Sequence, residues 1–305
     1  MRPTSLNCVY ELAQKDERVV FIGSDLGPGV LDEFKKNIPE RFFMEGVAEQ
    51  HIVGMAAGMA LEGFIPYVNT IATFLTRRCF EQNMIDLGLH RTNVRLISNG
   101  GGLVYAPLGP THLAIEDISI MRTIPNMTIV SPADANEMRR FMMQTLDYEG
   151  PIYIRLAKGY DPIVTPDDIP FKIGKAIKVK NGNDVLLVTT GITLGIAKEV
   201  SDALTKENIN CSILHMHTLK PIDKEALIQS SNEVQSVITL EEHTIVGGLG
   251  SACAELILEE GINIKNFKRI GINDLFPSGY GSQADMMKRN GLSVENVIST
   301  IKKFK

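Results

Sequence analysis

The segment 44–51, MEGVAEQH, places one acid, Glu49, at the start of a predicted helix. The residues that follow it, 52–61, are all apolar or glycine. Desolvation in such a neighbourhood raises the pKa of a carboxyl group, because burial disfavours the charged form. A carboxyl group that exchanges a proton near neutral pH can act as a general acid or base. Glu49 is therefore the first catalytic candidate; the alternative is an exposed acid favoured by the helix dipole.

A second segment, 72–82 (ATFLTRRCFEQ), combines aromatic and cationic side chains within a few helical turns. Phe74 and Phe80 flank Arg77 and Arg78. Aromatic stripes usually belong to a core, but the two arginines make a wholly buried face unfavourable. An aromatic pocket edged by a cation suits a flat heterocycle that lies close to an anionic substrate.

A glycine-rich segment, 100–117 (GGGLVYAPLGPTHLAIED), follows the predicted strand 94–98. It therefore belongs to the carboxyl end of a sheet, where α/β proteins bind ligands. Glycines 100–102 let the backbone approach a ligand closely. His112 stands in a turn with Pro110, just before the next predicted helix. A histidine in such a loop can move protons or bind a substrate hydroxyl, whereas a lone histidine is more often structural.

Two arginines could bind a phosphate. Arg155 ends the predicted strand IYIRL, again at the carboxyl end of the sheet, and Arg2 stands at the start of the printed sequence. The planar guanidinium group suits bidentate phosphate binding. For either residue considered alone, a surface salt bridge is the default interpretation.

Three further patterns predict structure rather than chemistry. GGLGSA at 247–252 lacks the full spacing of a dinucleotide site, which favours close helix packing instead. His215 and His217 share a strand face, as two zinc ligands might, but no third ligand lies near in sequence. The four cysteines are scattered without a CxxC pair, as expected for buried thiols in a reducing cytoplasm.

These candidates depend on alternating strands and helices for their positions. In the first half, the predicted buried strands are RVVFIG, FIPYVNT, VRLIS, MTIVS and PIYIRL. Short apolar strands separated by helices imply a parallel sheet covered on both faces. After MTIVS, the pattern predicts Ser131 as a helix N-cap and Pro132 as the first helical residue.

The alternation restarts after a polar, proline-bearing connector at 157–171. The predicted strands of the second half are DVLLVTT, INCSILHMHTL, VQSVITLEE and FKRIGIND, and its helices begin near Leu194, Asp223, Gly250 and Ser293. The sequence therefore predicts an α/β protein of two doubly wound domains, 1–170 and 183–305, with a linker at 171–182.

Composition excludes some classes of function. The net charge of −5 and the absence of a basic stripe argue against nucleic-acid binding. The 305 residues contain no uninterrupted run of 18 apolar residues, so no membrane span is expected. We therefore expect a cytoplasmic protein that acts on small molecules.

Several of these motifs, taken in order, resemble the thiamine-diphosphate-dependent transketolase family. MEGVAEQH, TFLTRR, GPTHLAIED, PADANE and IYIR are similar to its pyrimidine-binding domain, and HTLKPID and EEHTIVGGLGSA to its C-terminal domain. Full-length members carry a further N-terminal half, which binds the diphosphate and magnesium through a GDG…N motif. No GDG occurs in this sequence. The chain thus resembles the C-terminal subunit of a split transketolase, which implies a separate diphosphate-binding subunit and a heterotetramer of two copies of each.

The resemblance implies roles at the cofactor. Glu49 matches the glutamate that hydrogen-bonds the aminopyrimidine ring of thiamine diphosphate and promotes its imino tautomer. The other cofactor-binding positions implied are Asp25, Phe74, Arg77 and Phe80. The cofactor would be shared with the partner subunit, and Mg²⁺ would be bound mainly by the partner, with no metal ligand from this chain.

The resemblance also implies roles at the substrate. His112 matches a histidine that contacts the substrate and takes part in catalysis, and Arg155 and Arg2 match arginines that hold the sugar phosphate. Two departures stand out. The family usually has an aspartate four residues before this histidine, where this chain has Leu108, and glycines 100–102 replace a further histidine. A non-standard donor or acceptor sugar is therefore plausible.

The predicted activity is transfer of a two-carbon ketol unit between sugar phosphates, in complex with the diphosphate-binding partner. One alternative is a subunit like deoxyxylulose-phosphate synthase, which Arg77 favours because sugar-type members carry an aromatic there. The others are a subunit like the β chain of 2-oxo-acid dehydrogenases, which GPTHLAIED disfavours, and a catalytically silent regulatory subunit, which Glu49 disfavours.

Overall fold

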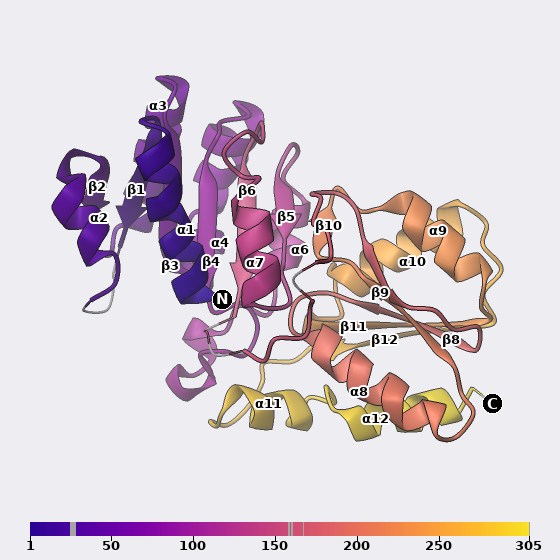
Figure 1. Ribbon diagram of the computed structural model, residues 1–305. Coiled ribbons are helices and arrows are strands. Elements are labelled where there is room, and N and C mark those ends of the chain that lie inside the picture. Colours follow the sequence, from indigo (N-terminus) through magenta and orange to yellow (C-terminus); the bar gives the residue numbers. More distant parts are fainter. Residues whose placement is uncertain (25–28, 158, 160, 167, 305) are drawn as a thin grey trace.

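The computed structural model describes residues 1–24, 29–157, 159, 161–166 and 168–304. Within these residues the chain forms two lobes, each built around its own β-sheet (Figure 1). The α/β class and the two-domain organisation predicted from the sequence are confirmed. Asp25, one of the predicted cofactor-binding residues, lies outside the described residues.

The first sheet has the strand order β10-β5-β6-β4-β3-β1-β2. Its strands are β1 (Val19–Gly23), β2 (Phe42–Met44), β3 (Ile65–Ile71), β4 (Arg95–Asn99), β5 (Thr128–Val130), β6 (Ile152–Leu156) and β10 (Thr218–Lys220). Strands β1 to β6 pair in parallel, as the buried apolar runs of β1, β3, β4, β5 and β6 predict; β2 was not predicted. Strand β10 was predicted as the end of one strand, INCSILHMHTL, but it is separate from β9 and pairs antiparallel with β5 of the first sheet.

The second sheet has the order β12-β11-β8-β9-β7. Its strands are β7 (Ile177–Lys180), β8 (Val185–Thr189), β9 (Cys211–His215), β11 (Ser236–Thr244) and β12 (Asn266–Ile272). Strand β7 lies inside the predicted linker 171–182, yet it pairs antiparallel with β9. Part of that stretch is thus a strand of the second sheet, while the domain bounds themselves stay a prediction.

Helices cover both sheets. They are α1 (Arg2–Lys15), α2 (Asp32–Asn37), α3 (Glu49–Leu61), α4 (Ala72–Thr76), α5 (Phe80–Gln82), α6 (Asp117–Arg122), α7 (Ala135–Met142), α8 (Thr193–Thr205), α9 (Lys224–Asn232), α10 (Leu249–Glu259), α11 (Gln283–Arg289) and α12 (Val294–Lys302). Short turns of helix, η1 (Pro39–Arg41), η2 (Asn83–Leu89), η3 (Ala106–Leu108) and η4 (Pro110–His112), connect them. Figure 1 shows α8 and α12 on one face of the second sheet and α9 and α10 on the other.

The start of α7 differs from the sequence prediction. The N-cap is Asp134, whose side chain accepts a hydrogen bond from the backbone N–H of Glu137 at 2.9 Å. Ser131, the predicted cap, instead donates its backbone N–H to the carbonyl of His217 at 2.7 Å. The prediction was wrong because the capping acceptor is the carboxylate of Asp134, three residues later, while Ser131 bonds through its backbone to the second half of the chain, a contact that leaves no local pattern.

The two lobes are held together by polar and apolar contacts. Arg122, at the end of α6, donates from Nη1 to the carbonyl of Gly247 (2.6 Å) and from Nη2 to Oε2 of Glu255 on α10 (2.6 Å). One buried apolar cluster contains Met121 from the first lobe together with Leu249 from the second. The lobes therefore share a core, which fixes the second lobe against the loops of the first.

Candidate active site

Glu49 is the first residue of α3 and is 1% exposed. One of its oxygens, Oε2, accepts a hydrogen bond from the guanidinium group of Arg78. The other oxygen, Oε1, is buried and has no hydrogen-bond partner among the described residues. A buried acceptor without a donor is unfavourable by about 1–3 kcal/mol. A ligand that donates an N–H or O–H to this oxygen would remove that penalty.

Aromatic rings continue from this ion pair toward His112. The guanidinium carbon of Arg78 lies 4.3 Å from the ring centroid of Phe74 on α4. The Phe74 ring in turn meets the His112 ring edge to face, with 5.4 Å between centroids. Thr73, Phe74, Arg77, Arg78 and Thr111 line one hollow. The structure thus brings Glu49, Phe74 and His112 together, three of the residues predicted from the sequence.

Arg77 contacts the segment that carries His112, and its predicted contact with the cofactor stays a prediction. Its Nε lies 2.9 Å from Oε1 of Glu116, and its Nη2 donates to the carbonyls of Thr111 (3.2 Å) and Leu113 (3.3 Å). Burial raises the pKa of Glu116. Arg77 therefore supports the segment that carries His112, while its neighbour Arg78 reaches Glu49.

Arg78 is the site residue that sequence reasoning did not select. The only signal available was its position beside Arg77 in TFLTRR. Phe80, at the start of α5, is 36% exposed and lines a separate hollow together with Arg77 and Ser119. Its predicted contact with the cofactor stays a prediction.

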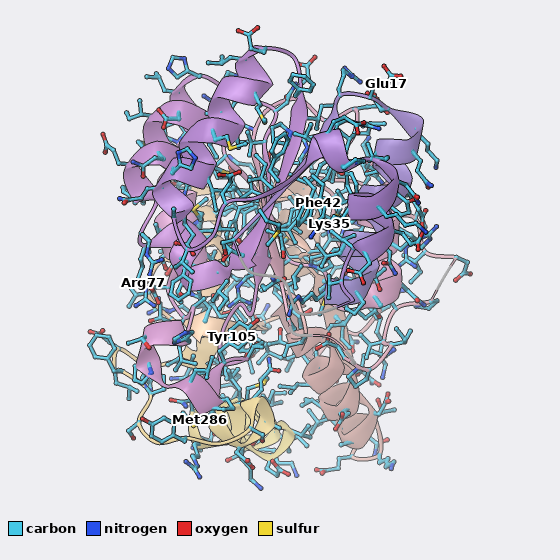
Figure 2. The ribbon with its side chains drawn as sticks, turned by 90° about the vertical axis from the view of Figure 1, so that its left-hand side faces the viewer. Glu17, Lys35, Phe42, Arg77, Tyr105 and Met286 are labelled. Carbon is cyan, nitrogen blue, oxygen red and sulfur yellow. The ribbon has the colours of Figure 1, made fainter. Side chains whose placement is uncertain are left out.

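The loop 103–113 carries His112 at the end of η4. Thr111 Oγ1 lies 2.9 Å from Nδ1 of His112. Leu108 is 53% exposed, so its side chain faces outward on the same loop. A hollow of about 620 Å³ opens beside the loop, between the lobes, and Arg77, Leu113 and Phe276 are among its lining residues. Figure 2 shows Arg77 at the edge of the first lobe, above the loop region that holds Tyr105.

The arginines predicted to hold a phosphate have other surroundings. Arg155 on β6 is 5% exposed, and its Nε donates to Oδ2 of Asp117 at 2.8 Å. Its Nη2 donates to the carbonyls of Glu242 (2.8 Å) and Ala114 (3.3 Å). Arg2, at the start of α1, has a buried Nε with no partner among the described residues. Arg155 is thus already paired within the protein, and phosphate binding by either arginine stays a prediction.

Strand β11 contributes a buried acidic pair. Glu241 accepts hydrogen bonds from the backbone N–H groups of Leu249 (2.7 Å) and Gly250 (2.9 Å), which start α10. Glu242 accepts a bond from the N–H of Leu103 at 2.8 Å. Burial raises the pKa of each carboxyl to about 7. Close packing explains GGLGSA as predicted, because a Cβ on Gly250 would lie 2.6 Å from Oγ1 of Thr239.

The raised pKa of Glu241 predicts a pH dependence of stability. Between about pH 4.5 and about pH 7, the folded chain keeps a proton that the unfolded chain releases. The free energy of unfolding should therefore fall as pH rises through this window, by on the order of 3 kcal/mol from this group. Urea unfolding of Glu241→Gln and wild type at about pH 5 and about pH 8 checks this, since the variant should gain relative stability at the higher pH. If the difference in the free energy of unfolding between the variant and the wild type is the same at both pH values, the prediction is contradicted.

The histidine pair of the second half is part of the core, which is one of the two structural alternatives, core or surface, that the sequence left open. Nε2 of His215 lies 3.1 Å from Oε2 of Glu137, and the His217 ring stacks on Phe171 with 3.9 Å between centroids. Burial lowers the pKa of His217 to about 4. In the part of the chain that the structure describes, no group of three or more His, Cys, Asp or Glu residues is arranged to hold a metal ion. None of the described helices is long and apolar enough to cross a membrane.

Comparisons with known proteins agree with this architecture. The model of the transketolase pyrimidine-binding domain matches residues 1–160, and that of the transketolase C-terminal domain matches residues 174–297. The chain is 34% identical to the 6-deoxy-6-sulfo-D-fructose transketolase subunit SqwH of Clostridium sp. (strain MSTE9), over 98% of this chain and 92% of that protein. It is 37% identical to the 1-deoxy-D-xylulose-5-phosphate synthase of Heliobacterium modesticaldum, over 95% of this chain but 44% of that protein.

A solved structure described as a split gene transketolase, inactive beta4 tetramer, superposes with a TM-score of 0.91 at 36% identity. The match covers 99% of this chain and 97% of that one. The chain therefore belongs to the transketolase family, and it comprises that family's pyrimidine-binding and C-terminal domains.

Proposed function

We propose that this chain is the C-terminal subunit of a two-component, thiamine-diphosphate-dependent transketolase that transfers a two-carbon ketol unit between sugar phosphates. The observation that carries the proposal is the state of Glu49. Its carboxylate is 1% exposed, one oxygen is bound by Arg78, and the other is buried with no donor in the part of the chain that the structure describes. An aminopyrimidine ring fits this oxygen, because its ring nitrogen donates a hydrogen bond once it carries a proton, as in the imino tautomer.

Each residue of the site has a defined task in this proposal. Glu49 holds the pyrimidine through Oε1, and Arg78 fixes the orientation of the carboxylate from the other side. Phe74 covers the pocket between Arg78 and His112, and His112 contacts the substrate. When bound, thiamine diphosphate supplies the carbanion chemistry, while the protein contributes orientation and electrostatics.

A partner subunit completes the site in this proposal. The printed sequence contains no GDG motif to bind the diphosphate and magnesium. Large apolar side chains are exposed on and around α3 and η2, which contact each other, and such patches mark interaction surfaces. They are Met44, Val47, Leu61, Phe64, Ile85 and Leu89. We propose a heterotetramer of two copies of each subunit, located in the cytoplasm.

The purified chain should show no turnover by itself. Mixing it with the chain that carries the GDG…N motif in the same organism should restore transfer from xylulose 5-phosphate, in the presence of thiamine diphosphate and Mg²⁺. A coupled assay of aldehyde product with each chain alone and with both together tests this. Turnover by this chain alone would refute the need for a partner.

A synthase-like activity is the second candidate, because Arg77 stands where sugar-type members carry an aromatic and a deoxyxylulose-phosphate synthase is among the relatives. Pyruvate consumption by the reconstituted pair would favour that candidate or one like the 2-oxo-acid dehydrogenase β chain. Binding of thiamine diphosphate without turnover of any donor would favour a regulatory subunit.

Leu108 should widen the range of donor sugars. Its side chain is 53% exposed on the His112 loop and cannot hydrogen-bond a hydroxyl. A hydroxyl left unpaired against leucine costs on the order of 1–3 kcal/mol, so donors without that hydroxyl should be used as well or better. A donor panel with wild type and Leu108→Asp measures this through kcat/KM. If wild type already strongly prefers xylulose 5-phosphate and aspartate adds nothing, the idea of a non-standard donor fails.

A further inference from the structure

The second lobe makes direct contact with the base of the loop that carries His112. Gly102 and Ala114 close the loop 103–113 through two backbone hydrogen bonds, of 2.8 and 3.1 Å. Just inside this closure, the N–H of Leu103 donates to Oε1 of Glu242 at 2.8 Å. Glu242 lies on β11 of the second sheet and is 2% exposed. A buried carboxylate from one domain thus holds a loop of the other.

Three more hydrogen bonds connect β11 with the residues that follow the loop. The N–H of Thr244 donates to the carbonyl of Ile115 at 2.7 Å. Nη2 of Arg155 donates to the carbonyls of both Ala114 and Glu242, so it joins the loop to β11. Both ends of the loop are therefore fixed to the same strand.

The approach of Glu242 to the loop depends on glycine. Gly102 has φ +74°, a conformation that favours glycine, and a Cβ there would lie 2.5 Å from Cδ of Glu242. Nε2 of Gln283 on α11 lies 2.9 and 3.0 Å from the two carboxylate oxygens. Donors on both sides thus set the position of the carboxylate.

The loop also packs on the second lobe through apolar side chains. Leu103, Ala106 and Leu113 are buried in one cluster with Leu240 and Met286 of that lobe. Figure 2 shows Tyr105 of the loop and Met286 of α11 at the junction where the two lobes meet. This apolar packing holds the loop as a whole against the second lobe, while the hydrogen bond to Glu242 fixes the position of its first residue, Leu103.

We infer that Glu242 is a positioning residue for His112: through the N–H of Leu103 it sets the place of the loop that presents the histidine to the substrate. The inference rests on the proposed function for the role of His112 itself. It gives the C-terminal domain a task in catalysis, because a small displacement of a group that contacts the substrate can lower the rate strongly.

The adjacent acid provides a matched control. Glu241 and Glu242 are both buried carboxylates on β11, but Glu241 binds the start of α10 and Glu242 binds the loop. Replacement of either glutamate by leucine removes the carboxylate acceptor and keeps a side chain of similar size. Glu242→Gln keeps an acceptor for the N–H of Leu103 and should restore most of what Glu242→Leu loses.

Hydrogen exchange on the full chain tests the contact without any assay of activity. Glu242→Leu should speed amide exchange in residues 103–113 by about tenfold or more, the expected effect of a lost hydrogen bond. Glu241→Leu should instead speed exchange at 249–250. Unchanged exchange in the loop of a folded Glu242→Leu chain overturns the inference. If that variant fails to fold, Gln283→Leu, which removes the two bonds from Gln283, decides the same question.

Kinetics with the GDG…N partner test whether the contact acts through His112. Glu242→Leu should lower kcat/KM for xylulose 5-phosphate by about tenfold or more in the wild-type background, and by much less in a His112→Ala background. Glu241→Leu should have equal effects in both backgrounds. Equal loss from Glu242→Leu in both backgrounds overturns the inference but leaves the proposed function intact. Native turnover by His112→Ala refutes the role of His112, and the inference falls with it.

Discussion

Replacement of Glu49 by glutamine should lower turnover of the reconstituted complex by roughly 10²–10⁴-fold, the usual contribution of a positioned acid or base. The side chain is 1% exposed, and its Oε1 has no partner among the described residues. Glutamine preserves the shape of the side chain but cannot exchange a proton with a ring nitrogen. Steady-state kcat with both subunits, thiamine diphosphate and Mg²⁺ measures the effect.

The control for this variant is Glu62→Gln. Glu62 is an exposed acid at the other end of α3, so its replacement should leave turnover unchanged. The fold of Glu49→Gln should survive, which circular dichroism and thermal denaturation of the isolated chain can verify. Near-native turnover by a folded Glu49→Gln subunit would contradict the central assignment.

Replacement of Arg155 by alanine should destabilise the chain by about 3–5 kcal/mol, the usual effect of removing one partner from a buried ion pair. Asp117 is fully buried, and the variant would leave its carboxylate with the hydrogen bond from the Tyr153 hydroxyl (2.7 Å) and with Nε2 of His243 at 3.9 Å. Urea unfolding of the isolated chain measures the loss. The double variant Arg155→Met with Asp117→Asn should recover part of it.

An exposed arginine–aspartate pair serves as the control. Arg18 is 57% exposed and lies 2.7 Å from Asp16, so Arg18→Ala should change stability by less than about 1 kcal/mol. The sequence resemblance implies instead that Arg155 binds a sugar phosphate. If Arg155→Ala keeps its stability and raises KM only for phosphorylated substrates, that role is supported and the structural one is contradicted.

The sequence alone determined the buried parallel strands of the first sheet and the position of the main acid. Buried strands such as RVVFIG and PIYIRL form β1 and β6 because runs of apolar residues with both faces covered are a local property. The placement of Glu49 at the start of α3 is likewise local, since it depends on neighbouring residues in one helix. The order of motifs was sufficient to identify the family.

Only the tertiary structure decided which partners these residues meet. Arg78, and not Arg77, reaches Glu49, because the direction of each side chain depends on how α4 is rotated against α3. Asp117 pairs with Arg155 across 38 residues of sequence, and Glu242 reaches Leu103 across 139. Such contacts follow from the packing of whole lobes and leave no periodic pattern. The candidate residues of the site can therefore be predicted from the sequence, while the hydrogen bonds and ion pairs that orient their side chains depend on the tertiary structure.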